Sequence, residues 1–186
     1  MEKVIIVEPE IPENTGFIAR LVANFDAELR VVNPEFNLSE ARKTASGCQD
    51  KLRETEIFDT LGEAIEDLEY VVGTKPGRGA GIDGFRAPEN TSLVIGRESS
   101  GLSNSELEMC DAVVHVESGG YSSLNQSHAA AILMHKIFIR QEEKTEIGGL
   151  NTVKEETGEA TLKLLKRAAP TETEARAAIS EIKENS

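Results

Sequence analysis

Three segments of the chain combine glycines with polar side chains in patterns that suit ligand binding. The first, residues 9–20, reads Pro-Glu-Ile-Pro-Glu-Asn-Thr-Gly and ends at Arg20. We expect Asn14 to cap a helix whose first turn offers free N–H groups to an anion. Arg20 follows six residues later, on a helix face that is otherwise apolar. It either faces a ligand there or is a snorkelling or ion-paired side chain.

The second segment, residues 95–102, reads Ile-Gly-Arg-Glu-Ser-Ser-Gly-Leu. Gly96 and Gly101 permit a tight turn and a close approach of a ligand to the backbone. Glu98 lies between them, where it would be partly buried and would need hydrogen-bond partners. An ordinary turn from a strand to a helix is the alternative.

The third segment, residues 117–126, reads Glu-Ser-Gly-Gly-Tyr-Ser-Ser-Leu-Asn-Gln. Ser122, Ser123 and Asn125 place donors and acceptors at the start of an apolar helix. Simple capping of that helix by Ser123 is the alternative.

Residues 75–86 form a fourth candidate, a mobile loop with Lys75, Arg78 and Arg86 among glycines. These cations could contact phosphate, and a solvated loop is the alternative. The loop also carries three glycines in the G-x-G-x-x-G spacing, Gly79, Gly81 and Gly84. That dinucleotide-binding pattern must open a helix, but a proline follows closely, so we reject it.

The histidines and cysteines do not suggest a metal site. His128 and His135 are seven residues apart, whereas a zinc pair on a helix usually stands at i and i+4. Cys48 and Cys110 stand alone and indicate reduced, buried thiols in a cytoplasmic protein. We therefore expect no metal.

Strand and helix signals alternate along the chain. Apolar, β-branched runs predict strands at residues 3–7, 28–32, 57–58, 70–73, 92–96 and 112–116. Helical spacing predicts helices at residues 14–25, 39–52, 60–68, 103–109 and 124–141. This order predicts an α/β fold with a parallel sheet and helices on both faces. Ligands bind at the carboxyl ends of such strands, where the candidate segments lie.

Composition predicts one globular domain and an appendage. The chain has 186 residues, 39% of them apolar, and the character changes after residue 141. We expect a domain at 1–141, a charged linker at 142–158 and a short helical tail at 159–186. Neither a signal peptide nor a membrane span is predicted. The net charge of −13 argues against coating by phosphate backbone but allows a local basic patch.

The motifs together resemble those of the SpoU branch of the SPOUT methyltransferases. The resemblance covers residues 3 to about 141 and rests on three ordered motifs: Pro12-Glu13-Asn14-Thr15-Gly16 through Arg20, Gly96-Arg97-Glu98 through Gly101-Leu102, and Ser122-Ser123-Leu124-Asn125. It implies an α/β SPOUT fold with a deep C-terminal trefoil knot, a homodimer, and S-adenosylmethionine held bent within the knot. The implied activity is 2′-O-methylation of a ribose in RNA.

Within the branch, the second and third motifs resemble the TrmJ subfamily, which methylates the tRNA nucleotide at the 5′ edge of the anticodon loop, position 32. The opening at residues 8–12 is instead similar to the wobble-nucleotide enzymes of the TrmL subfamily. An rRNA enzyme is a third possibility, although such enzymes usually carry an N-terminal RNA-binding domain. A non-catalytic RNA-binding protein is a fourth, against which the presence of Arg20, Glu98 and Asn125 argues.

The resemblance also implies roles for single residues. Arg20 would be the catalytic arginine, with Asn14 and Asn125 ordering the site and Glu98 bracing the knot loop. The cofactor would lie against Thr74, Lys75, Pro76, Gly96, Val116, Ser122, Ser123 and Leu124. The tRNA would meet Arg20, Lys75, Arg78 and Arg86. Because a guanidinium stays protonated at neutral pH, Arg20 suits binding of the neighbouring phosphate and stabilisation of the attacking oxygen better than proton abstraction.

Overall fold

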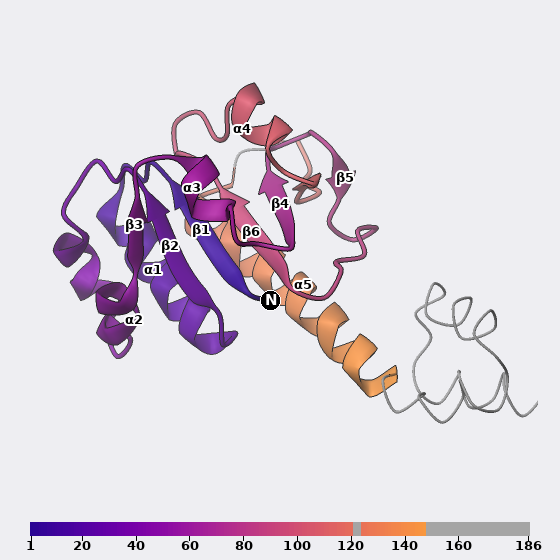
Figure 1. Ribbon diagram of the computed structural model, residues 1–186, viewed down its shortest axis with the longest axis horizontal. Coiled ribbons are helices and arrows are strands. Elements are labelled where there is room, and N and C mark those ends of the chain that lie inside the picture. Colours follow the sequence, from indigo (N-terminus) through magenta and orange to yellow (C-terminus); the bar gives the residue numbers. More distant parts are fainter. Residues whose placement is uncertain (121–123, 148–186) are drawn as a thin grey trace, which may run out of the picture. The chain divides into compact units, whose positions relative to one another are not determined.

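The computed structural model describes residues 1–120 and 124–147 (Figure 1). The chain divides into two compact units, Met1–Phe138 and Ile139–Ser186. The first unit contains the sheet and all of the candidate segments. Ser122 and Ser123, together with the predicted linker and tail from residue 148 onward, lie outside the described residues.

The described part of the chain forms one sheet of seven parallel strands in the order β3-β2-β1-β6-β4-β7-β5. The strands are β1 (Lys3–Val7), β2 (Glu28–Val32), β3 (Glu56–Phe58), β4 (Tyr70–Thr74), β5 (Ala80–Gly81), β6 (Thr91–Ile95) and β7 (Ala112–His115). The central strand β6 is buried along its whole length, and β1 is buried from Val4 to Val7, because both faces of the sheet are covered there. The parallel sheet predicted from the sequence is therefore confirmed.

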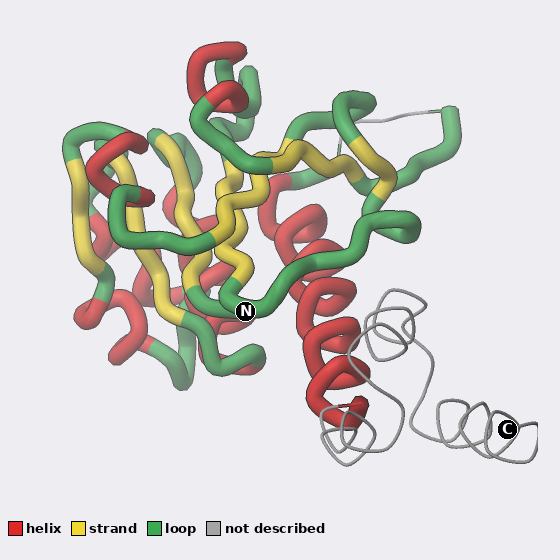
Figure 2. The backbone as a smooth tube through the Cα atoms, turned by 45° about the vertical axis from the view of Figure 1, so that its right-hand side comes forward, coloured by secondary structure: helices red, strands yellow, loops and turns green. Residues whose placement is uncertain are grey.

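Helices cover both faces of this sheet, as predicted (Figure 2). Val4 and Ile6 of β1 pack in the cluster that contains α1 and α5, whereas Ile5 and Val7 pack in the cluster that contains α3 and α4. This division follows from the alternation of side chains along a strand. The helices are α1 (Pro12–Asn24), the 3-10 helix η1 (Leu38–Lys43), α2 (Gln49–Glu54), α3 (Leu61–Ile65), α4 (Asn104–Glu108) and α5 (Gln126–Ile147).

The start of α1 differs from the prediction. The helix begins at Pro12 and its N-cap is Ile11, which makes no side-chain cap. Proline suits the first helical position because its missing N–H would be unpaired there anyway. Asn14 therefore lies inside the first turn and caps nothing, which leaves its amide for contacts elsewhere.

The helix predicted at residues 39–52 is interrupted. Asn37, not Ser39, caps η1, and Glu40 completes the capping box. The chain then passes through Gly47 in the left-handed region (φ +84°) before α2 begins. A glycine in that conformation ends a helix, so one predicted helix becomes two short ones.

Two further segments depart from the sequence reading. Residues 75–86 were expected to be a loop, but they contain the edge strand β5, which pairs with β7. The glycines are followed by a turn and then by β6 at Thr91, where a dinucleotide-binding motif would require the start of a helix. The last described helix, α5, continues to Ile147, beyond the predicted linker start at residue 142.

The two cysteines are less buried than the sequence predicted. Cys48 and Cys110 are free and half-buried rather than fully buried, and burial raises the pKa of the Cys110 thiol to about 11. Among the residues described, no helix has the length and apolar character needed to cross a membrane.

Candidate active site

A pocket of about 290 Å³ lies at the carboxyl ends of β4 and β6. Its lining includes Thr74, Lys75, Pro76, Gly96 and Leu124, all expected from the sequence to touch a cofactor. Val116 is not part of this lining, and Ser122 and Ser123 fall outside the described residues. The pocket therefore forms where the sequence placed a ligand site.

The segment after β6 is a tight turn, as its glycines predicted. Gly101 has a φ of +67°, and a Cβ on Gly96 would come within 2.3 Å of the backbone of Gly101 and Leu102. Only glycine at residue 96 allows the end of β6 to lie against its own return path. The turn brings Arg97, Glu98 and Ser99 to the pocket.

Glu98 is half-buried, and both of its carboxylate oxygens accept hydrogen bonds from the first segment. The backbone N–H of Glu10 donates at 2.9 Å, that of Ile11 at 3.3 Å, and the Asn14 amide at 3.1 Å. This confirms the prediction that Glu98 needs partners. A carboxylate occupied in this way is suited to holding the residue 10–14 backbone in place rather than to taking a proton from substrate.

The two asparagines continue the connection to the third segment. Asn125 donates through Nδ2 to Asn14 Oδ1 at 3.0 Å, and its own Oδ1 accepts from the N–H and hydroxyl of Ser127 at 2.9 and 2.8 Å. A single chain of hydrogen bonds therefore runs from Glu98 through Asn14 and Asn125 to Ser127. It joins all three motifs, and the sequence alone could only place each in its own loop.

Gln126, which the sequence reading did not single out, provides a test of fit for a ligand. Its Nε2 donates to the Gly96 carbonyl at 2.9 Å, whereas its Oε1 is buried without a hydrogen-bond partner among the described residues. Gln126 lines the pocket. A buried, unused acceptor in a pocket favours a ligand that carries N–H donors, and the amino groups of S-adenosylmethionine meet that requirement.

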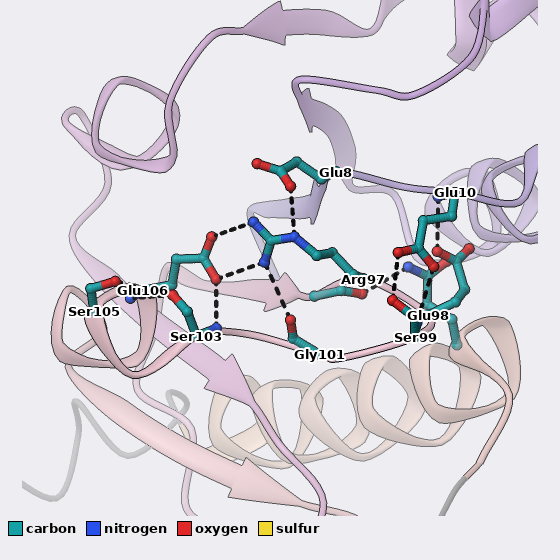
Figure 3. Close-up of polar contacts among 11 residues, drawn as sticks. Glu8, Glu10, Arg97, Glu98, Ser99, Gly101, Ser103, Ser105 and Glu106 are labelled. Carbon is teal, nitrogen blue, oxygen red and sulfur yellow. Dashed lines mark hydrogen bonds and ion pairs between the residues drawn. The ribbon is translucent and has the colours of Figure 1, made fainter.

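Arg97 holds the turn from its other side (Figure 3). Its Nε donates to Glu8 at 2.6 Å, and its two terminal nitrogens each donate to Glu106 at 3.0 Å. One of them also reaches the Gly101 carbonyl at 3.3 Å. These bonds raise the pKa of Arg97 and link the end of β1, the turn and α4.

Glu8 and Glu106 are the anionic partners of this cluster. Hydrogen bonding to Arg97 lowers the pKa of Glu8, whose backbone adopts a left-handed φ of +43°. Burial acts to raise the pKa of Glu106, but hydrogen bonds from Arg97 and Ser103 outweigh it and the pKa is lowered. Glu106 also completes the capping box with Ser103, as predicted for this helix.

Glu10 adds a second link between the first two segments. Its carboxylate accepts from the Ser99 N–H at 3.0 Å and from the Ser99 hydroxyl at 2.6 Å (Figure 3). Arg97, Glu10 and Ser99 were therefore missed as site-forming residues. The position of Arg97 directly between Gly96 and Glu98 was the available signal.

The predicted RNA contacts differ in how free they are. Arg20 is exposed and has no partner among the described residues, and neither has the exposed Arg86. Lys75 Nζ instead donates to the Leu102 carbonyl, and Arg78 donates to Asn104 Oδ1 at 2.6 Å. Two of the three cations at residues 75–86 are thus engaged within the protein.

No group of three or more His, Cys, Asp or Glu side chains suited to a metal ion occurs within residues 1–120 and 124–147.

Comparison with known proteins identifies the family. The sequence matches the SpoU rRNA Methylase family over residues 2–135. It is 33% identical over 158 residues to the tRNA (cytidine-2′-O-)-methyltransferase TrmJ of Methanocaldococcus jannaschii, covering 76% of this chain and 69% of the relative. It is 32% identical over 152 residues to the tRNA (cytidine/uridine/adenosine-2′-O-)-methyltransferase TrmJ of Pseudomonas aeruginosa, covering 73% and 59%.

A solved structure extends the comparison. The fold is similar to that of the SpoU methyltransferase AviRb of Streptomyces viridochromogenes, solved in complex with the cofactor AdoMet, with a TM-score of 0.67 and 25% identity over 75% of this chain and 60% of that one. Fold and site thus define a methyltransferase of the α/β class. The chain belongs to the SpoU methylase family.

Proposed function

We propose that this protein methylates a ribose 2′-hydroxyl of tRNA with S-adenosylmethionine as the donor. The observation that carries the proposal is the hydrogen-bonded chain Glu98–Asn14–Asn125, which joins the three motif segments around one pocket. The TrmJ relatives, named as tRNA 2′-O-methyltransferases, support the choice of tRNA. The AdoMet complex of AviRb supports the choice of donor.

Thr74, Lys75, Pro76, Gly96 and Leu124 would hold the cofactor, with Gln126 Oε1 accepting from one of its amino groups. Val116, Ser122 and Ser123 complete the set that the family resemblance implies. When bound, the cofactor supplies an electrophilic methyl group, and no metal is required for its transfer. The protein's part is to fix the pocket rigidly, since positioning contributes much of the acceleration in such a displacement.

Arg20 would bind the phosphate beside the target ribose and stabilise charge on the attacking 2′-oxygen. Its exposure and lack of a partner among the described residues leave all of its donors available. A planar guanidinium holds phosphate through two parallel hydrogen bonds, which an ammonium cannot do. Asn14, Glu98 and Asn125 would act through the backbone that they order.

The proposed target is the nucleotide at the 5′ edge of the anticodon loop, tRNA position 32, as in the TrmJ subfamily. The proposed assembly is a homodimer with the family's trefoil knot. Exposed apolar side chains at the start of α1 and α5, Ile11, Phe17 and Leu124, support a contact between subunits there. Mass spectrometry of tRNA methylated by the purified protein would locate the modified nucleotide. Modification at the wobble position would show that the wobble nucleotide, and not position 32, is the target.

Substitution of Arg20 tests the mechanism. Arg20→Ala should reduce methyl transfer to tRNA by at least about 100-fold, the scale for loss of a group that stabilises developing charge, and Arg20→Lys should be nearly as poor. Affinity for S-adenosylhomocysteine, measured by calorimetry in EDTA, should stay within a few-fold because Arg20 does not line the pocket. Near-normal turnover of Arg20→Lys would show that a point charge suffices. Loss of cofactor affinity in Arg20→Ala would mean that Arg20 contacts the cofactor rather than the tRNA.

A further inference from the structure

Most of the described lysine and arginine side chains of this acidic protein bind another group of the protein, and a few do not. Most of the described ones are engaged: Lys3, Arg30, Lys51, Arg53, Arg97 and Lys136 in ion pairs, and Lys75 and Arg78 in hydrogen bonds. Among the cations whose side chains the structure describes, Arg20, Arg42, Lys43 and Arg86 are exposed and have no partner within the described residues. A chain with a net charge of −13 has ample carboxylates to neutralise them, so the cations left over require an explanation.

Arg20, Arg42 and Lys43 lie on two elements that pack together. A Cβ on Gly16 of α1 would lie 2.4 Å from the Ala41 carbonyl and 2.0 Å from Thr44 Oγ1, so the helix touches the end of η1 directly. Arg20 follows Gly16 by four residues and lies on the same face of α1, about 6 Å further along the helix. Arg42 and Lys43 lie between the two residues that Gly16 contacts.

The nearest acidic residue of η1 does not neutralise them. Glu40 accepts from the Asn37 N–H at 3.1 Å as part of the capping box, at the opposite end of η1. Arg42 and Lys43 occupy the last turn, where the helix carbonyls also favour positive charge. Three exposed cations, Arg20, Arg42 and Lys43, therefore lie on the two elements that meet at Gly16.

We infer that Arg42 and Lys43 extend the site into a surface that binds the phosphate backbone of the RNA flanking the target nucleotide. The inference rests on the proposed function, because Arg20 is the point at which this surface meets the reacting ribose. Exposed, unpaired cations are the groups that release counterions from nucleic acid, whereas cations already paired to carboxylates contribute little. In this assignment Arg42 and Lys43 contribute to RNA affinity and take no part in methyl transfer.

Salt dependence of tRNA binding tests the inference. We compare wild type, Arg42→Gln/Lys43→Gln, and the matched control Lys51→Gln/Arg53→Gln on the neighbouring α2, whose cations are paired with Glu54 and Asp50. Both variants change the net charge by two, so any effect of global charge is equal. The first variant should flatten the slope of log affinity against log salt by about 1.5 in total, at 0.7–0.9 per phosphate contact, and the control should retain the wild-type slope.

Three results would overturn the inference: a wild-type slope in Arg42→Gln/Lys43→Gln, an equal loss in the control, or no binding of tRNA by the wild-type protein. Thermal unfolding of both variants shows that they are folded. Binding of S-adenosylhomocysteine should stay within two-fold of wild type in both variants, because neither pair of residues lines the pocket. If wild type binds tRNA with the expected slopes but neither binds S-adenosylhomocysteine nor transfers methyl groups, the proposed enzyme function fails and the RNA surface stands.

Discussion

Arg97 gathers segments that are far apart in the sequence. Its side chain is 19% exposed, and its partners Glu8 and Glu106 are 32% and 14% exposed. Ion pairs with this degree of burial leave costly, unpaired charges when one member is removed. Glu8 also has a left-handed backbone conformation, although it is not a glycine. This conformation is strained, and its contacts with Arg97 must offset the strain.

Replacement of Arg97 by glutamine should therefore lower the free energy of unfolding by about 2 to 4 kcal/mol. Arg53→Gln removes a comparable cation from an exposed pair with Asp50 and should cost less than about 1 kcal/mol. Urea denaturation of the two variants provides the comparison. Equal, small losses would mean that the Arg97 cluster contributes no more than a surface ion pair.

The same cluster predicts a dependence of stability on acid. The pKa values of Glu8 and Glu106 are lowered in the folded protein below the ordinary value of 4.5. The stabilisation is thus complete above about pH 4.5 and is lost as the pH falls through the folded values and the carboxyls protonate. In Arg97→Gln the unfolding free energy should accordingly fall less steeply with pH below pH 4.5 than in wild type. An unchanged pH dependence would show that Glu8 and Glu106 do not cause the loss of stability in acid.

For single residues, the sequence predicted which side chains belong to the site more accurately than it predicted their hydrogen-bond partners. Asn14, Glu98 and Asn125 were identified, but Asn14 was expected to cap a helix and instead contacts Glu98. Side-chain partners 84 to 111 residues away cannot be inferred from local spacing. The roles of Arg97 and Gln126 were missed for the same reason.

Among the elements, the contact between α1 and η1 depends on the absence of a side chain at residue 16. In Gly16→Ala the new Cβ would meet the Ala41 carbonyl and the Ala45 nitrogen at 2.4 and 3.0 Å, and backbone cannot turn aside as a side chain can. We expect a loss of about 1 to 3 kcal/mol in unfolding free energy despite the better helix propensity of alanine.

Gly62→Ala in α3 is the matched control, since the nearest atom to its Cβ would be Thr60 Oγ1 at 4.0 Å. Without a clash, alanine should be neutral or stabilise by up to about 1 kcal/mol. Thermal unfolding of the two variants should move in different directions. If Gly16→Ala were as stable as wild type, α1 and η1 would have to separate easily.

Strands were easier to predict than short helices because β1, β2, β4 and β6 each contain a run of buried, mostly β-branched apolar residues. The two-residue strand β5 has no such run and is defined only by its pairing with β7. The break between η1 and α2 depends on packing against Gly16 as well as on Gly47. These features are set by tertiary contacts, which local patterns do not encode.

For the whole molecule, the proposed homodimer gives a direct expectation. Light scattering at micromolar protein should return twice the chain mass of 20.2 kDa. Phe17→Glu would place a charge on a side chain that is 43% exposed and should shift the mass toward the monomer. Ile57→Glu is the control, because Ile57 lies on the edge strand β3 and is 59% exposed. Leu68→Glu would not serve, because Leu68 packs against the core. A monomeric wild type would remove the dimer from the proposal.

The chain of hydrogen bonds through the three motifs also determines when a site can exist during synthesis. Asn14 and Glu98 leave the ribosome before Asn125 and Ser127, which complete the chain. Until Asn125 has emerged, Asn14 Oδ1 lacks its amide partner, although Glu98 can already accept from the Asn14 amide and join the first two motifs. Ligand binding is therefore acquired late, and a nascent chain that stalls after β7 carries all seven described strands of the sheet without a finished site.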